Sequence, residues 1–314
     1  MAKNSKKQLK YAFGRVSLKI CSLIIKILPL RLVYAIAKFM GYIGYRIAGK
    51  QRKIALESLS YAFGNQKSIK ERQHIAQECF INMAKSALEL LYLMNKTSQV
   101  KERVFIKGRE NLDQALAKGK GIIALTAHFG NFPLMLIRLA QEGYQVSGIM
   151  KPMHDEKIEN YFYNRRKKMG IKTIYSQPRK ECVDSTIANL RKNELVLIQV
   201  DQNFGAHGGI YVDFFGTKAA TATGPVVFAL RTKASIVPMF IKRNNDDTQD
   251  IIIEPAIGIK ELDNQEETLL RNTQTFTEIT EKYIKLYPAE WGWIHKRWKS
   301  KQEMPQIKTP HGVR

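Results

Sequence analysis

From residue 121 onward, short apolar runs alternate with longer amphipathic stretches, and this alternation constrains the fold more than any other feature of the chain. "GIIALT" (121–126) and "LVLIQVD" (195–201) are continuous apolar runs, as in strands that are buried on both faces. The stretches between such runs carry apolar residues at helical spacing, and "KIENYFYNRRKKMG" (157–170) ends at a glycine. The alternation predicts an α/β fold with a mixed, largely parallel sheet flanked by helices.

The expected elements follow one another without a low-complexity linker. Further strands are expected at 145–151, 172–176, 235–243 and 249–255. Helices are expected at 52–64, 69–93, 133–143, 157–170, 183–193, 224–234 and 266–288, with Ser68 as the N-cap of the second. Sites in parallel sheets gather at the carboxyl ends of the strands, which draws attention to the residues that follow each expected strand.

The first 48 residues combine apolar blocks with basic residues and contain no acid, since Glu57 is the first acidic residue of the chain. Lysine and arginine among leucine and isoleucine suit an anionic membrane face, where their long stems reach toward the headgroups. Charges interrupt the apolar blocks too often for a plain transmembrane helix, and no signal-peptide cleavage site follows them. We expect an interfacial membrane anchor at 1–48; a buried helical hairpin is the alternative.

The formal net charge of +23 indicates an anionic partner: nucleic acid, an anionic lipid surface or an acidic protein. No nucleic-acid partner is expected, because the basic residues lie among aliphatic side chains rather than stacking aromatics. Cys21, Cys79 and Cys182 have the spacing of neither a disulfide framework nor a zinc site. The chain contains no dinucleotide fingerprint, P-loop or metal-ligand spacing, so no metal and no cofactor are expected.

His128 follows the run at 121–126 and precedes an expected helix that Pro133 can begin. The partial positive charge at a helix N-terminus favours a neutral imidazole, which can accept a proton from an alcohol. A single histidine in such a turn is more often a structural residue that hydrogen-bonds its own loop. The sequence around His128 and further along the chain favours the functional interpretation.

Four segments resemble the lipid A late-acyltransferase branch of the lysophospholipid acyltransferase superfamily. "HFGNFP" (128–133) is similar to the family motif His-x4-Asp/Glu, often found within His-x-Gly-Asn-Trp-Glu. "DQNFGAHGGIYVDFFGTKAATATGP" (201–225) resembles its Asp-Gln…Phe-Phe-Gly-Thr block, and "YPAEWGWIHKRWK" (287–299) resembles its tryptophan-rich tail. "RKIALESLSYAFG" (52–64) resembles an early segment. The matches occur in family order, and they imply a glycerolipid acyltransferase-like fold.

The resemblance implies direct transfer of a fatty acyl group from a thioester to a lipid hydroxyl, with the thioester as co-substrate. His128 would take the hydroxyl proton, and a carboxylate would orient it, as in the triad arrangement. Asp201 and Gln202 match the family's Asp-Gln pair. Arg166, or else Arg165, matches its conserved arginine, which would contact the oxyanion or a phosphate; a solvated basic helix face is the alternative.

Two further groups are expected to bind substrate. The backbone amides around Gly130 and Asn131, at a helix start, are candidate donors to the oxyanion. Thr221 and Thr223 precede the helix expected at 224–234, where free N–H groups and hydroxyls favour a phosphate; ordinary helix capping is the alternative. The tryptophans of 287–299 suit either a membrane-interface belt or a packing role.

Pro133 stands where the family motif has its acid, and Phe132 replaces the usual tryptophan. Three interpretations remain open. His128 works with a backbone carbonyl or water in a slow enzyme; or the protein is a non-catalytic lipid-binding relative; or another acid orients His128, the candidates being Asp201, Asp155, Glu156 and Asp213.

We therefore expect an anchor at 1–48, an acyltransferase domain at 49–299 with a helical lead-in at 49–100, and a polar tail at 300–314. The expected activity moves an acyl chain from an acyl carrier protein or coenzyme A thioester to a hydroxyl of a lipid A precursor or similar anionic glycolipid. The expected location is the cytoplasmic face of the inner membrane. Another lysophospholipid or glycolipid is the alternative acceptor.

Overall fold

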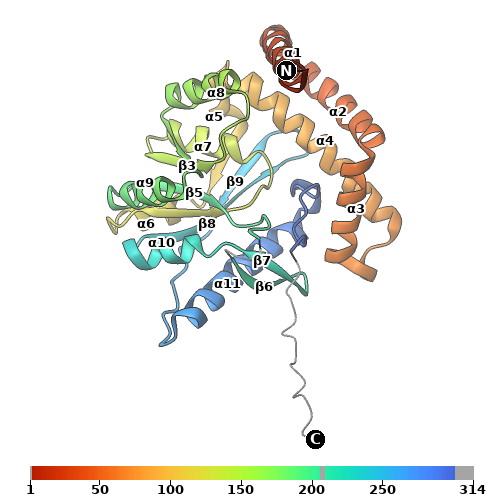
Figure 1. Ribbon diagram of the computed structural model, residues 1–314. Coiled ribbons are helices and arrows are strands. Elements are labelled where there is room, and N and C mark those ends of the chain that lie inside the picture. The colour runs from red at the N-terminus through yellow and green to blue at the C-terminus, as the bar shows by residue number, and fades with distance from the viewer. Residues whose placement is uncertain (1, 206–208, 301–314) are drawn as a thin grey trace, which may run out of the picture.

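The predicted strands pair into one sheet in the computed structural model, which describes residues 2–205 and 209–300 (Figure 1). Within those residues seven strands lie in the order β1-β9-β8-β2-β5-β3-β4, and neighbours run parallel except β8 and β9. This confirms the mixed, largely parallel sheet. The strands of the sheet are β1 (Val104–Lys107), β2 (Ile122–Thr126), β3 (Val146–Met150), β4 (Ile171–Tyr175), β5 (Leu195–Gln199), β8 (Ser235–Arg243) and β9 (Gln249–Ile253).

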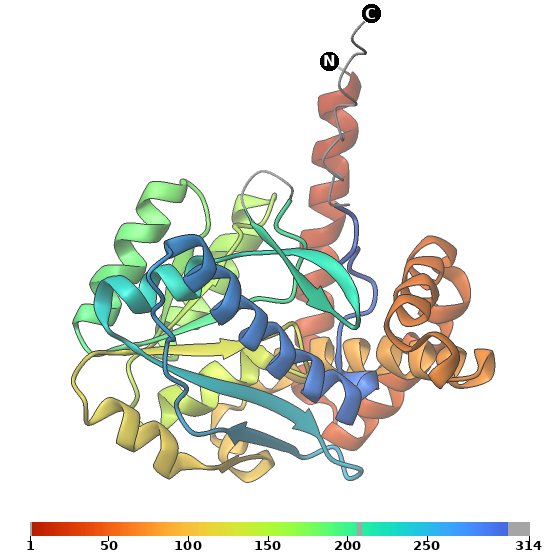
Figure 2. The same ribbon diagram turned by 90° about the horizontal axis from the view of Figure 1, so that it is seen from below.

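Helices cover both faces of the sheet (Figures 1 and 2). One apolar core takes residues from α6 and α7, and a second takes residues from α9, α10 and α11. The helices are α1 (Ala2–Ile27), α2 (Leu30–Ile47), α3 (Gly49–Phe63), α4 (Ile69–Leu93), α5 (Val100–Arg103), α6 (Arg109–Leu116), α7 (Phe132–Gln141), α8 (Glu156–Lys168), α9 (Arg179–Arg191), α10 (Gly224–Thr232) and α11 (Gln265–Leu286), with 3-10 turns η1 (Gly64–Gln66), η2 (Thr97–Gln99) and η3 (Pro288–Glu290).

Strand β2 shows why the run at 121–126 is apolar throughout. Ile122 and Ala124 contact the core on one face of the sheet, and Ile123 and Leu125 contact the core on the other. Successive side chains of a strand point to opposite faces, so a central strand covered on both sides needs an apolar residue at every position. β2 lies between β8 and β5, which places its carboxyl end near the middle of the sheet.

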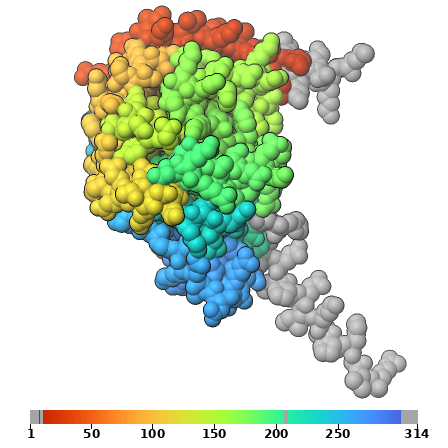
Figure 3. Space-filling view, turned by 90° about the vertical axis from the view of Figure 1, so that its left-hand side faces the viewer, coloured from red at the N-terminus to blue at the C-terminus, as the bar shows by residue number. Residues whose placement is uncertain are grey.

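The N-terminal helices pack on the α/β body through α4. Val33 of α2 is buried, and Gly41 approaches Ile81 so closely that a Cβ there would lie 2.5 Å from the Cα of Ile81. The alternative of a buried helical hairpin therefore holds only in part: the inner sides of α1 and α2 pack on α4. The outer side of the hairpin is different, because α1 and α2 leave many large apolar side chains in solvent, and the two helices run along one edge of the molecule (Figure 3).

No helix within the described residues is long and apolar enough to cross a bilayer. The expected N-cap is confirmed, since Ser68 accepts a hydrogen bond from the Glu71 amide in a full capping box at the start of α4. Apart from Ser300, the polar tail expected at 300–314 lies outside the described residues.

Two parts of the fold were absent from our sequence-based expectations. The first is β1 with α6, a four-residue strand and an eight-residue helix that are too short for a clear periodicity. The second is the antiparallel hairpin of β6 (Ile210–Phe214) and β7 (Thr217–Thr221), which packs near α11 (Figure 2). Phe214 and Ala219 of this hairpin are buried, which makes "FFG" partly a core segment.

Candidate active site

His128 and Asp201 meet because each follows one of two neighbouring parallel strands. β2 and β5 pair in register from Ile122 with Leu195 to Thr126 with Gln199, so the loops after them leave the sheet side by side. The Nδ1 of His128 lies 2.9 Å from Oδ1 of Asp201, and the backbone N–H of His128 donates to the same oxygen at 3.0 Å. The two bonds fix both the loop and the imidazole ring.

The Asp201 carboxylate is fully enclosed and fully hydrogen-bonded. The residue is 2% exposed, and its second oxygen, Oδ2, accepts a hydrogen bond from the indole Nε1 of Trp291 at 2.8 Å. Burial alone would raise the pKa of Asp201, but the attraction of His128 and the three donors together lower it to about 2. Asp201 is therefore a buried anion throughout the physiological pH range.

The protonation of His128 differs from our expectation. A helix N-terminus follows it, but a neighbouring carboxylate is the stronger influence: burial lowers the pKa of His128, and Asp201 raises it by more, so the net shift is upward. With Nδ1–H donated to Asp201, Nε2 carries the lone pair of the ring and is the atom that can take up a proton. The side-chain Nε2 of Gln202 lies 3.1 Å from that atom.

A cavity of about 270 Å³ lies beside His128, and three segments far apart in the chain form it. α4 supplies one wall, the start of α7 a second, and the C-terminal segment a third. Phe132 packs edge-on against the His128 ring at 5.4 Å between centroids. The lining is mostly apolar; it consists of Cys79, Asn82, Met83, Ser86, Ala87, Leu90, His128, Gly130, Asn131, Phe132, Pro133, Ala289, Glu290, Gly292 and His295.

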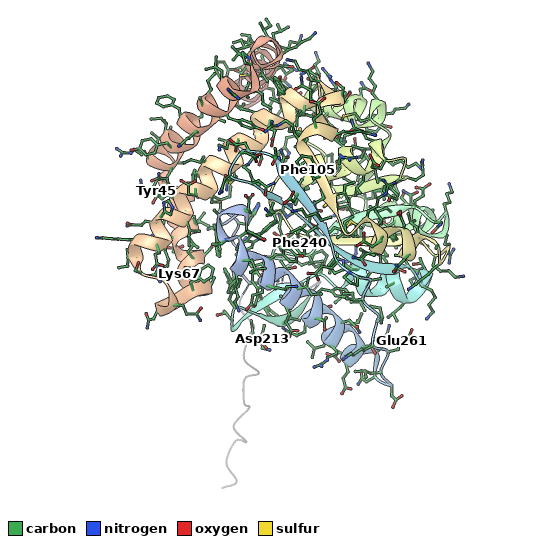
Figure 4. All side chains as sticks on the ribbon, turned by 180° about the vertical axis from the view of Figure 1, so that it is seen from behind. Tyr45, Lys67, Phe105, Asp213, Phe240 and Glu261 are labelled. Carbon is green, nitrogen blue, oxygen red and sulfur yellow. The ribbon has the colours of Figure 1, made fainter. Side chains whose placement is uncertain are left out.

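Pro133 lies in the first turn of α7 and forms part of this cavity wall, so the position of the missing acid is apolar. Of the four candidate acids, only Asp201 contacts His128 within the described residues. Asp155 caps α8 and accepts hydrogen bonds from its first amides, and Glu156 is exposed beside it. Asp213 lies at the outer surface on β6, where it pairs with Lys218 (Figure 4).

Gly130 and Asn131 hold the loop of His128 in place. Gly130 has φ of +57°, and a Cβ there would lie 2.0 Å from the Ile241 carbonyl oxygen, so only glycine fits. Its N–H donates to the Glu290 carbonyl at 2.9 Å, which leaves it no proton for an oxyanion. The Asn131 side-chain amide donates to the Ser86 carbonyl and to buried Glu89.

Arg165 and Arg166 do not reach His128 in the structure. Arg166 donates to Glu159 and to the hydroxyl of Thr173, and Arg165 donates to Met94 and Asn95. The physical reason is the direction of α8. It leaves the carboxyl edge of the sheet after β3 and runs back toward the start of β4, so its last turn lies near the opposite edge.

Thr221 and Thr223, the expected phosphate-binding residues, lie away from the cavity beside His128. Thr221 is buried, and its hydroxyl oxygen accepts a hydrogen bond from Arg297. Thr223 occupies the N-cap position of α10, but its side chain makes no capping hydrogen bond. Neither hydroxyl lines the cavity beside His128.

The C-terminal segment contributes most of what the sequence analysis did not assign to the site. Trp291 and Trp293 are fully buried, so they pack in the core rather than form a membrane belt. The rings of His295 and His128 lie 5.3 Å apart between centroids. Arg297 is buried, and its guanidinium donates hydrogen bonds to the Gln202 and Ala220 carbonyls. The one sequence feature that could have pointed to these residues is the resemblance of 287–299 to the tryptophan-rich tail of the family.

No group of three or more potential metal-ligating side chains occurs within the described part of the chain. The ionisable groups that converge beside the cavity include the His128 imidazole, its buried partner Asp201 and the second imidazole of His295.

Comparison with known proteins gives a family model described as "Bacterial lipid A biosynthesis acyltransferase", which matches residues 2–300. A lipid A biosynthesis acyltransferase of Haemophilus influenzae is 26% identical over 276 residues, 87% of this chain and 83% of the relative. A lipid A biosynthesis lauroyltransferase of Escherichia coli is 23% identical over 280 residues, 88% of each chain. A phosphatidylinositol mannoside acyltransferase of Mycobacterium tuberculosis is 24% identical over 196 residues, 62% of this chain and 59% of the relative.

Proposed function

The chain belongs to the bacterial lipid A biosynthesis acyltransferase family and is an acyltransferase, and from this premise we propose that it acylates a hydroxyl of a lipid A precursor or a related anionic glycolipid. The observation that carries the proposal is the pairing of Asp201 with His128, which lines a mostly apolar cavity. A base with an enclosed carboxylate partner suits a reaction in which an alcohol must lose a proton.

The proposed reaction uses His128 twice. Nε2 takes the proton of the acceptor hydroxyl as the oxygen attacks the carbonyl carbon of the acyl thioester. The tetrahedral intermediate then collapses: the C–S bond breaks, the ester remains on the acceptor, and the thiolate takes the proton from Nε2. Gln202 lies on Nε2 in this structure, so its side chain must turn aside, or be displaced by the hydroxyl, before the first step.

Asp201 performs the part that the family motif gives to the residue at position 133. Its Oδ1 holds Nδ1–H, which keeps Nε2 as the acceptor and stabilises the imidazolium form between the two proton transfers. Of the three interpretations of Pro133, this favours an active enzyme with another acid. Pro133 itself would form part of the surface that contacts lipid.

The size of the cavity bears on how the substrates bind. At about 270 Å³ it lies below the range of about 300–1,000 Å³ typical of pockets for drug-sized ligands. It is large enough for the thioester end of an acyl chain and too small for a whole lipid. The rest of each substrate would remain outside, in a carrier or in the membrane.

The charge and the N-terminal helices support a membrane-bound setting and an acidic donor. Exposed apolar residues of α1 and α2 include Phe13 (74%), Ile27 (82%) and Phe39 (67%), and basic residues such as Lys38 lie among them. Such a surface suits an anionic leaflet at the cytoplasmic face of the inner membrane. The donor would be a thioester of acyl carrier protein or coenzyme A, both anionic partners for a chain of net charge +23.

The test uses purified full-length protein in detergent with radiolabelled acyl carrier protein or coenzyme A thioester and an extracted pool of anionic glycolipids. We expect labelled glycolipid from the wild type and a loss of at least about 10⁴-fold in His128→Ala. Label in a phosphatidylinositol mannoside instead would assign the alternative acceptor. Background-level transfer by the wild type and by His128→Ala, to the glycolipid pool and to phosphatidylinositol mannoside alike, would reject the proposed activity in favour of a lipid-binding relative.

A further inference from the structure

We propose that His295 is a catalytic residue that donates a ring N–H to the oxyanion of the tetrahedral intermediate. The inference rests on the proposed acyl transfer and adds to it the group that stabilises the negative charge on the former thioester carbonyl oxygen. When the acceptor oxygen adds to the carbonyl carbon, the C=O π electrons move onto oxygen, and a donor within hydrogen-bond distance lowers the barrier.

Three other cavity-lining donors are already occupied, whereas the backbone N–H groups of Asn131 and Phe132, at the start of α7, donate to no described residue and can share the oxyanion with His295. The Gly130 N–H donates to the Glu290 carbonyl, and the Asn131 side-chain amide donates to the Ser86 carbonyl and the Glu89 carboxylate. The Cys79 thiol donates to the Trp291 carbonyl at 3.1 Å. Each of these contacts would have to break before the group could serve an oxyanion.

Two cavity-lining side chains keep a proton to donate and are rivals of His295. The Asn82 amide donates one of its two N–H protons to the Ala289 carbonyl. The Oγ of Ser86 accepts from Arg243 at 3.4 Å and keeps its own proton. Arg165 and Arg166 are bound elsewhere.

The ring of His295, in contrast, has no hydrogen-bond partner among the described residues. Within residues 2–205 and 209–300 its imidazole makes no hydrogen bond, although it lines the cavity and its ring lies 5.3 Å from that of His128 between centroids. Its backbone N–H donates to the Gly292 carbonyl at 3.1 Å, which fixes the turn that carries it. An imidazole that lines the cavity without a protein partner keeps its N–H for a bound substrate.

Gly292 makes this placement possible. A Cβ at position 292 would lie 3.0 Å from Cδ2 and 3.2 Å from Nε2 of His295, closer than side-chain contacts normally come. The same glycine donates its N–H to the His128 carbonyl at 3.2 Å. The glycine therefore brings the second histidine against the loop that carries the first.

The pKa values of the two rings shift in opposite directions, as a proton acceptor and a neutral hydrogen-bond donor require. Burial and the charge of His128 lower the pKa of His295, whereas Asp201 raises that of His128. A neutral imidazole keeps one N–H to donate, and neutral histidine is an established electrophile toward a carbonyl oxygen in triosephosphate isomerase. One histidine thus accepts the proton while the other stabilises the oxyanion.

The experiment compares His295→Phe, which keeps a ring but has no donor, with His295→Gln, which keeps a donor but cannot titrate. We expect kcat for glycolipid acylation to fall about 10²–10³-fold in His295→Phe with KM nearly unchanged, and His295→Gln to recover at least about tenfold of that loss. Ser86→Ala and Asn82→Ala test the rival donors, and a loss in either as large as that in His295→Phe would assign the oxyanion to that side chain instead. His154→Phe, at an exposed histidine, is the matched control and should stay within about threefold of the wild type.

Hydrolysis of the acyl thioester by water, measured without an acceptor lipid, separates the two proposals because it also forms an oxyanion. Suppose the wild type hydrolyses the thioester, His295→Phe does not, and neither forms a glycolipid product. That result would support the oxyanion role of His295 and reject the glycolipid as the acceptor. Normal kcat in a folded His295→Phe, or equal losses in the Phe and Gln variants, would overturn the role of His295. Absence of both reactions in the wild type would overturn both proposals.

Discussion

The ring Nδ1 and the backbone N–H of His128 share one oxygen, Oδ1 of Asp201, at 2.9 and 3.0 Å. The two contacts tie the imidazole and its loop to the end of the neighbouring strand. Because Trp291 holds the other carboxylate oxygen, the Asp201 side chain has little freedom to turn. The arrangement supplies the orienting acid from a position 73 residues along the chain, so Pro133 need not carry one.

The first prediction concerns the pH dependence of activity. His128 acts in its deprotonated form, and its pKa lies above the usual 6.5 because Asp201 outweighs burial. The value of kcat/KM should therefore rise with pH, with a midpoint above 6.5. In Asp201→Asn only burial remains, so the midpoint should move below that of the wild type. Identical midpoints in the two proteins would show that the carboxylate does not act on His128.

The second prediction concerns the missing motif acid. Pro133→Glu restores a carboxylate in the first turn of α7, where the helix N-terminus tolerates it. The Nδ1 of His128 already donates to Asp201, so the new acid has no proton to accept. We expect kcat to stay within about threefold of the wild type or to fall. Pro133→Ala is the control for loss of the ring. A gain of tenfold or more, roughly 1.4 kcal/mol in the barrier, would show that the wild type lacks its orienting acid.

The third prediction concerns the buried anion that anchors the His128 loop. Glu89 is 1% exposed and accepts hydrogen bonds from Asn131, Arg243, Gln249 and Tyr34. Glu89→Gln leaves the buried Arg243 without this counter-charge and should lower the free energy of unfolding by about 3–5 kcal/mol. Chemical denaturation measures it. Glu57→Gln, in an exposed pair with Lys53, should change it by less than about 1 kcal/mol. Equal changes in the free energy of unfolding for the two variants would show that the Glu89 network does not stabilise the fold.

The fourth prediction concerns the outer surface of α1 and α2. Phe39 is 67% exposed on α2, and Phe39→Asp would place an acid on the face proposed to meet an anionic leaflet. We expect co-sedimentation with vesicles rich in anionic phospholipid to fall severalfold, since the substitution removes apolar burial and adds a negative charge that the leaflet repels. Leu286→Asp, at a similarly exposed apolar residue on α11, is the control. Equal losses in both variants would argue against α2 as the contact surface.

The sequence predicted the α/β core well because each central strand is an unbroken apolar run between helical stretches, as β2 and β5 show. It also placed His128 and Asp201 after strand ends. It could not show that these strands are neighbours, because β3 and β4 lie between them in the chain, although in the sheet both lie on the far side of β5. Four candidate acids therefore remained until the strand order was known.

The arginines and His295 show the limits of motif resemblance. Arg165 and Arg166 match the family's pattern in sequence, but the direction of α8 carries them away from His128. The sequence analysis considered His295 only together with the tryptophans of 287–299, as part of a membrane belt or a packing segment. Its approach to His128 depends on the C-terminal segment folding over the His128 loop, where Phe129 and Trp291 form a β-bridge. Contacts between segments so distant in the chain are set by packing, which a single sequence does not reveal.

The central claim is that His128 and Asp201 act as one unit in acyl transfer. The most direct test measures kcat for wild type, His128→Ala, Asp201→Asn and the double variant with the same thioester and glycolipid. We predict a loss of about 10⁴-fold for Asp201→Asn, a loss at least as large for His128→Ala, and a double variant no more than about threefold below His128→Ala. Losses that multiply in the double variant, or an active His128→Ala, would contradict the account.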